Sequence, residues 1–123
     1  MLQLDGIEAG YGRTSCLKGV SLTVNEGEIV TLLGANGAGK TTMLLAISGL
    51  LAIRRGTVTF RGQALNRAAP AEIVARGVSH VPEGRRILPR LTVRENLELG
   101  AFLRRDRHAI QRDRGRMFEL FPI

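Results

Sequence analysis

The sequence predicts an α/β fold in which a glycine-rich loop joins a buried strand to a helix. The loop is formed by residues 34–42, which read Gly-Ala-Asn-Gly-Ala-Gly-Lys-Thr-Thr and match the pattern G-x-x-x-x-G-K-[ST]. The apolar run before it, residues 29–33, contains several β-branched side chains and is typical of a buried parallel strand. After it, four residues recur at the spacing of a helix with one buried face, namely Leu44, Ile47, Ser48 and Leu51. The three parts follow one another in the order that a phosphate-binding loop requires.

The loop has the residue types needed to hold the phosphates of a nucleotide. Its glycines let backbone N–H groups turn toward an anion, and the next helix directs its positive N-terminus at the same point. We expect Lys40 to bring a charge to the β- and γ-phosphates and the hydroxyl of Thr41 to bind Mg²⁺. A glycine-rich turn with an incidental lysine is the alternative. The predicted nucleotide-binding residues of this stretch are Asn36, Gly37, Ala38, Gly39, Lys40, Thr41 and Thr42.

Length and composition predict one small domain with an aliphatic core, because 44% of the 123 residues are apolar and only 4% are aromatic. The single cysteine, Cys16, excludes an internal disulfide and is expected as a small buried residue. The longest apolar stretch, residues 43–53, is interrupted and too short to cross a bilayer, and the N-terminus lacks a secretory pattern. We therefore expect a cytosolic protein or one on the inner face of a membrane.

The net charge of +7 is unevenly distributed. Residues 1–53 carry three basic and four acidic side chains, whereas residues 54–123 carry fifteen arginines and seven acids. A basic half is compatible with nucleic acid, anionic lipid headgroups or an acidic partner, and equally with a solvated face. No aromatic residues are interleaved with the arginines as a binding platform, so we expect no nucleic acid partner.

The first third of the chain predicts part of a small sheet. Two strands with one buried face are expected from Leu2, Leu4 and Ile7 and from Val20, Leu22 and Val24. A turn at residues 10–12 separates them, and a turn at residues 25–28 leads into the apolar run.

Beyond the loop, residues 57–60 are expected as a further strand of the same sheet. Pro70 is expected to open a short helix that reaches about Arg76 and stops at Gly77. Residues 78–81 are then expected as a second buried strand.

The last third of the chain is predicted to be helical. Thr92 and Glu95 form the pattern of a capping box, and an apolar side follows with Val93, Leu97, Ala101 and Phe102. Residues 104–116 predict a charged linker or an exposed helix. His108 lies there without other metal-binding residue types and is expected to be exposed.

Taken together, these features resemble the N-terminal half of the nucleotide-binding domain of ABC transporters, over essentially the whole chain. The segments that carry the resemblance are residues 19–22, 27–30, 34–42, 48–50 and 56–58. In this family an aromatic residue upstream of the loop stacks on adenine, and the resemblance gives this role to Tyr11. A partly buried loop aromatic is the alternative for Tyr11.

Downstream segments resemble a narrower group, the ATP-binding subunits of branched-chain amino acid importers, with urea and amide importers close behind. These segments are residues 81–86 (Val-Pro-Glu-Gly-Arg-Arg), 91–97 (Leu-Thr-Val-Arg-Glu-Asn-Leu) and 118–122 (Phe-Glu-Leu-Phe-Pro). Most ABC ATPases carry Gln where this chain has Glu83. In the family that position contacts Mg²⁺ and the attacking water and links the site to the transmembrane partner. Glu83 can still ligate Mg²⁺ through oxygen, and a solvated turn residue is the alternative.

The resemblance implies a P-loop NTPase core with an N-terminal antiparallel β-subdomain, truncated before the signature and the second-half strands. Within residues 1–123 it implies an antiparallel β part (1–28 and 56–62), a nucleotide-binding core (29–55 and 77–84) and the start of a helical subdomain (85–123). The implied cofactors are ATP and Mg²⁺. The implied partners are transmembrane permease subunits, docked near Arg85, Arg86 and the helix from Thr92, and a second ATP-binding subunit.

In the family, ATP hydrolysis needs motifs from the second half of the domain, and this sequence lacks them. The sequence contains no Ser-Gly-Gly and no apolar run ending in Asp-Glu, and His80 comes too early to be the family's switch histidine. The apolar ending at residues 117–123 also suggests truncation. We therefore expect a chain that binds Mg-ATP without turnover, from a parent ATPase on the cytoplasmic face of the plasma membrane that powers uptake of a solute.

Three alternatives remain at this point. A P-loop kinase or GTPase usually places its loop nearer the N-terminus, and a GTPase needs an Asn-Lys-x-Asp motif that this sequence lacks. A non-enzymatic module would use the basic half for binding. An ABC-type ATPase outside transport is the third alternative, and the resemblance of residues 82–85 to the importer group argues against it. The transported solute itself is not encoded in any motif found.

Overall fold

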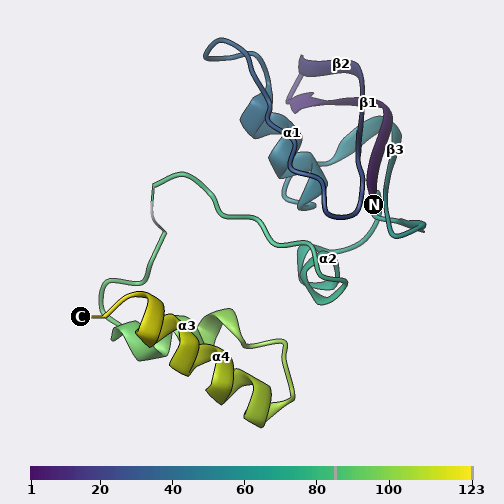
Figure 1. Ribbon diagram of the computed structural model, residues 1–123. Helices are drawn as coiled ribbons and strands as arrows, with labels where there is room; N and C mark the ends of the chain where they lie inside the picture. The colour runs from purple at the N-terminus through teal and green to yellow at the C-terminus, as the bar shows by residue number, and fades with distance from the viewer. Residues whose placement is uncertain (85, 123) are drawn as a thin grey trace. The chain divides into compact units, whose positions relative to one another are not determined.

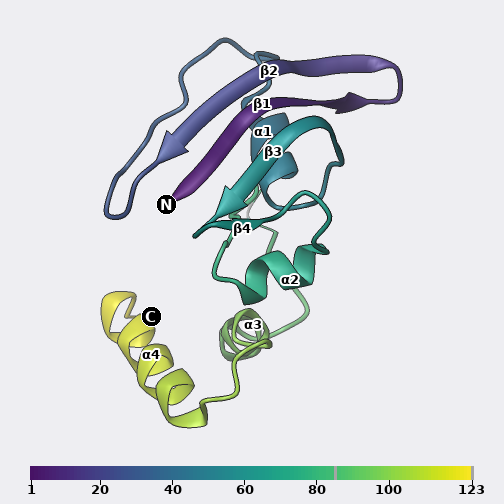
Figure 2. The ribbon, with the colours of Figure 1, turned by 90° about the vertical axis from the view of Figure 1, so that its right-hand side faces the viewer.

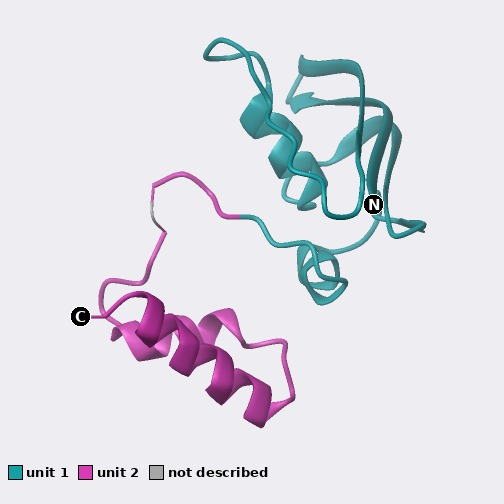
Figure 3. Ribbon diagram, viewed as in Figure 1, with its two compact units in different colours: residues 1–80 teal, residues 81–123 magenta. Residues whose placement is uncertain are grey.

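The computed structural model describes residues 1–84 and 86–122, and the chain divides into two compact units. The first unit comprises residues 1–80 and contains the sheet, and the second comprises residues 81–123 and is helical (Figure 3). Within the described residues no helix is long and apolar enough to cross a membrane.

A twisted antiparallel sheet organises the first unit (Figures 1 and 2). Its strands are β1 (Leu2–Tyr11), β2 (Thr14–Val24), β3 (Ile53–Phe60) and β4 (Gln63–Ala64), in the order β2-β1-β3-β4. The strands predicted from the alternation of apolar residues are therefore confirmed, and residues 57–60 join the same sheet as expected. The first turn lies later in the sequence than expected. Tyr11 still belongs to β1 and pairs with Thr14, so the turn itself is residues 12 and 13.

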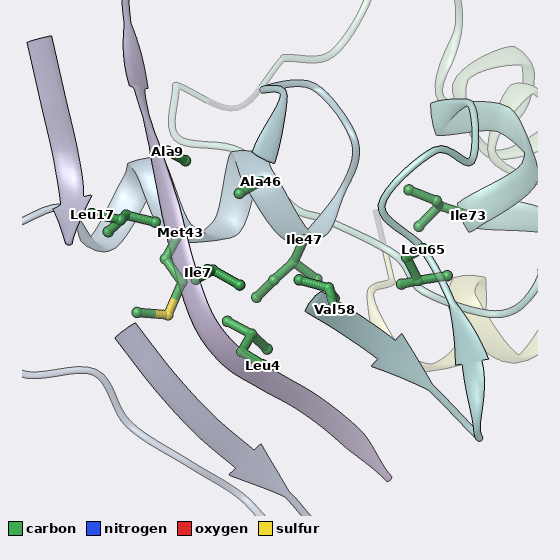
Figure 4. Close-up of a cluster of buried hydrophobic side chains, with 10 residues drawn as sticks. All are labelled: Leu4, Ile7, Ala9, Leu17, Met43, Ala46, Ile47, Val58, Leu65 and Ile73. Atoms are coloured by element: carbon green, nitrogen blue, oxygen red, sulfur yellow. The ribbon is translucent and has the colours of Figure 1, made fainter. Parts of the chain in front are cut away.

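The core of the first unit lies between the sheet and two helices, α1 (Lys40–Ile47) and α2 (Pro70–Ala75). Figure 4 shows the buried cluster, which consists of Leu4, Ile7, Ala9, Leu17, Met43, Ala46, Ile47, Val58, Leu65 and Ile73. It contains no aromatic side chain, as the composition predicts. Helix α2 begins at Pro70 and is followed by Gly77 in a left-handed conformation (φ 101°), so both of its predicted boundaries are confirmed.

The buried face of α1 differs from the predicted one. The helix buries Thr42, Met43, Ala46 and Ile47, whereas Leu44 is 42% exposed. Residues 43–47 are all apolar, so a helical period fits two faces equally well and the sequence pattern does not choose between them. Ser48 is buried as expected, and the helix ends there before Gly49.

Two predicted strands, residues 29–33 and 78–81, are absent from the sheet. Neither segment pairs with a strand of residues 1–84 or 86–122, and Ile29, Leu33 and Val81 are 95%, 89% and 91% exposed. A buried parallel strand needs a neighbour on each edge to satisfy its N–H and C=O groups, and no described residues supply one. The prediction of strands at these positions is therefore wrong for this structure.

The second unit contains α3 (Val93–Gly100) and α4 (Arg107–Leu120). The capping box is confirmed, because the Thr92 hydroxyl accepts from the Glu95 N–H and the Glu95 carboxylate accepts from the Thr92 N–H. The Asn96 side chain bonds both the N–H and the C=O of Leu88, at 2.9 and 3.1 Å, and so fixes the segment before α3.

For the charged residues 104–116 the sequence left open a linker or an exposed helix, and the structure has a helix, α4, without buried residues. His108 on this helix is exposed as predicted. Arg114 of α4 forms an ion pair with Glu98 of α3, and Asp113 of α4 forms one with Arg104 in the connection between the two helices. Phe102 lies beyond the end of α3 and is 79% exposed, so it does not extend the apolar side of that helix.

Candidate functional site

The phosphate-binding loop depends on two glycines in the left-handed region. Gly37 has φ 87° and Gly39 has φ 93°, conformations that other residues adopt at a cost of about 1–2 kcal/mol. A Cβ on Gly39 would also lie 2.9 Å from Leu17 Cδ2 and 3.4 Å from the Cys16 carbonyl oxygen. The loop is therefore pressed directly against β2, and Gly39 is required both for conformation and for space.

The N-terminus of α1 is open toward the loop. Its N-cap is Gly39, which has no side chain to accept the first N–H groups, and the first turn holds no acidic residue. The backbone N–H groups at a helix start have no partner within the helix, and the helix dipole makes this end positive. These donors are thus free to bind an anion, and their positive end favours one.

Lys40 is held across the loop by the loop's own backbone. Its Nζ donates to the carbonyl oxygen of Gly34 at 2.6 Å and to that of Ala35 at 2.8 Å. An ammonium group has three N–H donors, so one remains for a phosphate oxygen. The charge is consequently fixed beside the open N–H groups of α1 before any ligand binds.

The two threonines after Lys40 have different surroundings. Thr41 is exposed, so its hydroxyl is accessible to a metal ion at the start of α1. Thr42 is 7% exposed and lies among the core residues beneath the loop. Asn36, Gly37 and Ala38 are exposed. All seven predicted loop residues thus lie at or just before the start of α1, where the open N–H groups, Lys40 and the Thr41 hydroxyl are of the types that suit phosphate oxygens and Mg²⁺.

Tyr11 lies on the same unit, toward the turn of the β1–β2 hairpin. The loop touches β2 at Cys16 and Leu17, and Leu17 pairs with Ala9, two residues before Tyr11. Figure 2 shows that the hairpin continues past α1 to its turn. The Tyr11 side chain is half exposed, so it is accessible to a flat ligand, and its stacking on adenine stays a prediction.

Glu83 belongs to the second unit, in a segment of bends that precedes the helices. It is exposed, and none of the hydrogen bonds of the described residues involves it. Its role toward Mg²⁺ stays a prediction. Arg85 lies outside the described residues, and Arg86 is exposed.

His80 makes a contact that the sequence did not predict. Its Nδ1 lies 3.3 Å from the Ser48 hydroxyl at the end of α1. The Ser48 hydroxyl also donates to the Leu44 carbonyl oxygen at 2.9 Å. The partial burial of the histidine therefore reflects an anchor on α1 instead of a strand position. The only feature of the sequence that indicates this contact is a histidine within the apolar residues 78–81.

Cys16 is partly exposed, in contrast to the buried position expected for it. It lies on β2, where its carbonyl faces Gly39. No three His, Cys, Asp or Glu side chains gather as a metal site among residues 1–84 and 86–122. A Mg²⁺ ion here would depend on Thr41 and on the phosphate oxygens of the nucleotide.

Comparison with known proteins was made on the sequence and on the fold. The sequence model of a family described as ABC transporter matches residues 17–121. A high-affinity branched-chain amino acid transport ATP-binding protein of Pseudomonas aeruginosa is 42% identical over 123 residues, covering 99% of this chain and 52% of its own length. A ribose import ATP-binding protein of Yersinia pestis is 35% identical over 105 residues, covering 85% of this chain and 21% of its own length.

Solved structures give the same result. The ATP-binding subunit of an ABC transporter superposes with a TM-score of 0.73 at 34% identity, over 84% of this chain and 42% of that one. A dimeric bacterial ABC transporter cassette superposes with a TM-score of 0.75 at 29% identity, over 85% and 48%. The chain spans about half the length of the Pseudomonas relative and less of the other proteins named.

Proposed function

Because the chain belongs to the ABC transporter family, we propose that it forms the ATP-binding portion of an importer ATPase. The observation that carries the proposal is the position of Lys40, tied to the loop carbonyls of Gly34 and Ala35 beside the uncapped start of α1. A positive charge and several backbone donors at one point form a site for a polyphosphate.

In this proposal each loop residue has a defined task. The N–H groups around Gly37 and Gly39 bind phosphate oxygens, Lys40 neutralises the β- and γ-phosphates, and the Thr41 hydroxyl ligates Mg²⁺. Tyr11 stacks on the adenine ring. Glu83 completes the ligands of Mg²⁺ and orients the attacking water in the parent protein. Bound Mg-ATP supplies the phosphoryl group whose transfer releases free energy for transport.

The proposed solute is a branched-chain amino acid or a related compound. It is supported by the branched-chain amino acid transport function for which the Pseudomonas relative is named and by the resemblance of residues 81–86 to that importer group. Other relatives carry names of ribose and sn-glycerol-3-phosphate import, at 35% and 38% identity. The relatives therefore share the ATP-binding role but differ in solute, so the amino acid is the more specific part of the proposal.

The proposed partners are permease subunits and a second ATP-binding subunit on the cytoplasmic face of the plasma membrane. One solved relative is a dimeric cassette, which supports the second of these. The chain carries neither Ser-Gly-Gly nor an apolar run ending in Asp-Glu. We therefore infer that it binds Mg-ATP but does not hydrolyse it by itself.

Calorimetric titration of Mg-ATP into three proteins tests the proposal. The proteins are the unaltered chain, Lys40→Ala, and Lys18→Ala as a matched control, since Lys18 is exposed on β2 and is the other lysine of the chain. We expect the Lys40 variant to bind at least tenfold more weakly, because hydrogen bonds to charged groups contribute about 1.5–3 kcal/mol. The Lys18 variant should bind within about twofold of the unaltered chain.

Two results would contradict the proposal. Equal affinities of the two lysine variants would show that ATP binds elsewhere, for instance on the arginine-rich half. Absence of binding by a folded, unaltered chain, with circular dichroism typical of its helices and strands, would show that this half does not form a nucleotide site alone.

A further inference from the structure

We propose that Arg54 is a positioning residue that fixes the β1–β2 turn and thereby sets the orientation of Tyr11. This inference rests on the proposed function, because Tyr11 matters to a ligand only if the loop binds a nucleotide. It concerns Arg54 itself, a residue that no motif in the sequence singles out.

The first observation is a long-range hydrogen bond. Arg54 Nη2 donates to the carbonyl oxygen of Gly12 at 2.6 Å, across 42 positions of the sequence. Arg54 stands near the start of β3, where Ile53 pairs with Ala9 of β1. A bond between a guanidinium and a carbonyl is charge-assisted and stronger than a neutral one. The tip of the hairpin is thus tied to the neighbouring strand.

The second observation is the lack of other support at this tip. Tyr11, Gly12, Arg13 and Thr14 are all exposed. Within residues 1–84 and 86–122, the Arg54 bond is the side-chain hydrogen bond that joins this turn to another strand. A two-stranded ribbon end without packing is weakly ordered. The bond from Arg54 therefore has a large share in the order of the turn.

The third observation is a bulge next to Tyr11. The register of β1 and β2 shifts between Ala9 and Gly10, and a Cβ on Gly10 would collide with the carbonyl oxygen of Thr14 and with the Cys16 N–H. Bulges bend a strand and change the direction of the side chain that follows. The glycine thus permits the bend, and Arg54 holds the turn in the resulting position.

Order at the turn affects binding through entropy. A ring that stacks on a base must lose its freedom, and a turn already fixed has less freedom to lose. Immobilising a flexible side chain costs about 0.5–1.5 kcal/mol, so we expect loss of the Arg54 bond to weaken Mg-ATP binding by about three- to tenfold. Binding of a ligand without a base should remain unchanged.

The composition of the chain provides a specific probe. Tyr11 is the single tyrosine and the chain has no tryptophan, so tyrosine fluorescence reports on this residue alone. A Tyr11→Phe variant, which lacks this fluorophore, supplies the background fluorescence. Arg55→Ala is the matched control for Arg54→Ala, since Arg55 follows on β3, is exposed, and its side chain makes no hydrogen bond among the described residues.

The experiment measures affinity for Mg-ATP and for Mg-tripolyphosphate by calorimetry, together with the fluorescence anisotropy of Tyr11 without ligand. For Arg54→Ala we expect weaker Mg-ATP binding, unchanged tripolyphosphate binding and a lower anisotropy. We expect Arg54→Lys, which keeps the charge on a shorter reach, to lie between this variant and the unaltered chain. Arg55→Ala should behave as the unaltered chain does.

Three outcomes would overturn the inference. If Arg54→Ala weakens the binding of Mg-ATP and of Mg-tripolyphosphate equally, Arg54 stabilises the fold as a whole and has no specific effect on Tyr11. If Arg54→Ala and Arg55→Ala have equal effects, the change is due to the loss of a positive charge alone. Unaltered anisotropy in Arg54→Ala would show that the turn does not depend on this bond. If the unaltered chain binds neither ligand, the proposed function fails, and the anisotropy without ligand still decides whether Arg54 orders Tyr11.

Discussion

Strand β1 and the segment of residues 29–33 are both predicted from the sequence as strands with buried apolar residues, but only β1 is a strand in the structure. Strand β1 pairs with β2 on one edge and β3 on the other, and its Ile7 is fully buried. Residues 29–33 pair with no described strand, and Ile29 is 95% exposed. The two isoleucines, both expected in buried strands, therefore lie at opposite extremes of exposure.

The difference lies in how each strand obtains a neighbour. Strand β1 reaches β2 through a turn of two residues, so its partner is supplied by the adjoining sequence. A parallel strand obtains its neighbours through crossover connections of a dozen or more residues. An apolar run thus indicates that a segment is suited to burial, while the partner that buries it must come from elsewhere in the chain.

The largest effect that tests this comparison is expected from alanine at the two isoleucines. Ile7→Ala removes a side chain that is 0% exposed within the core and should lower the free energy of unfolding by about 2–5 kcal/mol. Ile29→Ala should change it by no more than about 0.5 kcal/mol, since its side chain is in water. Urea titrations followed by circular dichroism measure both values.

A large loss of stability in Ile29→Ala would contradict the comparison, because it would show that residues 29–33 are buried in solution. The ordering of the two variants is therefore more informative than either value by itself. Titrations at several protein concentrations show whether a second copy of the chain covers the segment.

The next effect concerns the close approach of β1 and β3. Gly56 has φ 81°, and a Cβ there would lie 2.5 Å from the backbone of Gly6. Gly62 has φ 76° but has no atom within 4 Å of such a Cβ. Gly62→Ala should therefore show the conformational effect alone, about 1–2 kcal/mol, and Gly56→Ala should destabilise by about 1–3 kcal/mol more.

Both glycine variants are measured by the same urea titration. Equal losses in the two would mean that β1 and β3 separate easily, and the sheet would then be less fixed than its pairing indicates. A larger loss for Gly62→Ala would reverse the predicted ordering altogether.

Features with a local cause were predictable from the sequence. The loop follows from its glycines and Lys40, the hairpin from alternation of apolar residues, and the start of α3 from Thr92 and Glu95. Each of these depends on residues within a few positions of one another. The family followed from the same local motifs, and the match to residues 17–121 confirms it.

Features with a distant cause were not predictable. The bond from Arg54 to Gly12 and the contact of His80 with Ser48 join residues 42 and 32 positions apart. The buried face of α1 depended on which side of an all-apolar helix meets the sheet. The periodicity of a segment does not determine these contacts or this buried face, because they depend on how other elements pack against it.

The smallest effect concerns the capping box at the start of α3, a motif whose hydrogen bonds all lie between Thr92 and Glu95. Hydrogen bonds from the Thr92 backbone N–H and hydroxyl hold the pKa of Glu95 below its ordinary value of 4.5. A carboxylate whose pKa is lowered by folding stabilises the folded state above its unfolded pKa, and this contribution is lost as the pH falls through the lower folded pKa.

Glu95→Gln should therefore reduce the helical circular dichroism slightly near neutral pH, and its difference from the unaltered chain should vanish as the pH falls below about 4.5. Glu119→Gln is the matched control, since Glu119 lies exposed near the end of α4 and its side chain makes no hydrogen bond among residues 1–84 and 86–122. A difference for Glu95→Gln that persists in acid would mean that the carboxylate charge does not stabilise the cap. Because the box needs no distant partner, its effect should also be the same whether residues 29–33 are covered or exposed, which separates it from the two larger effects.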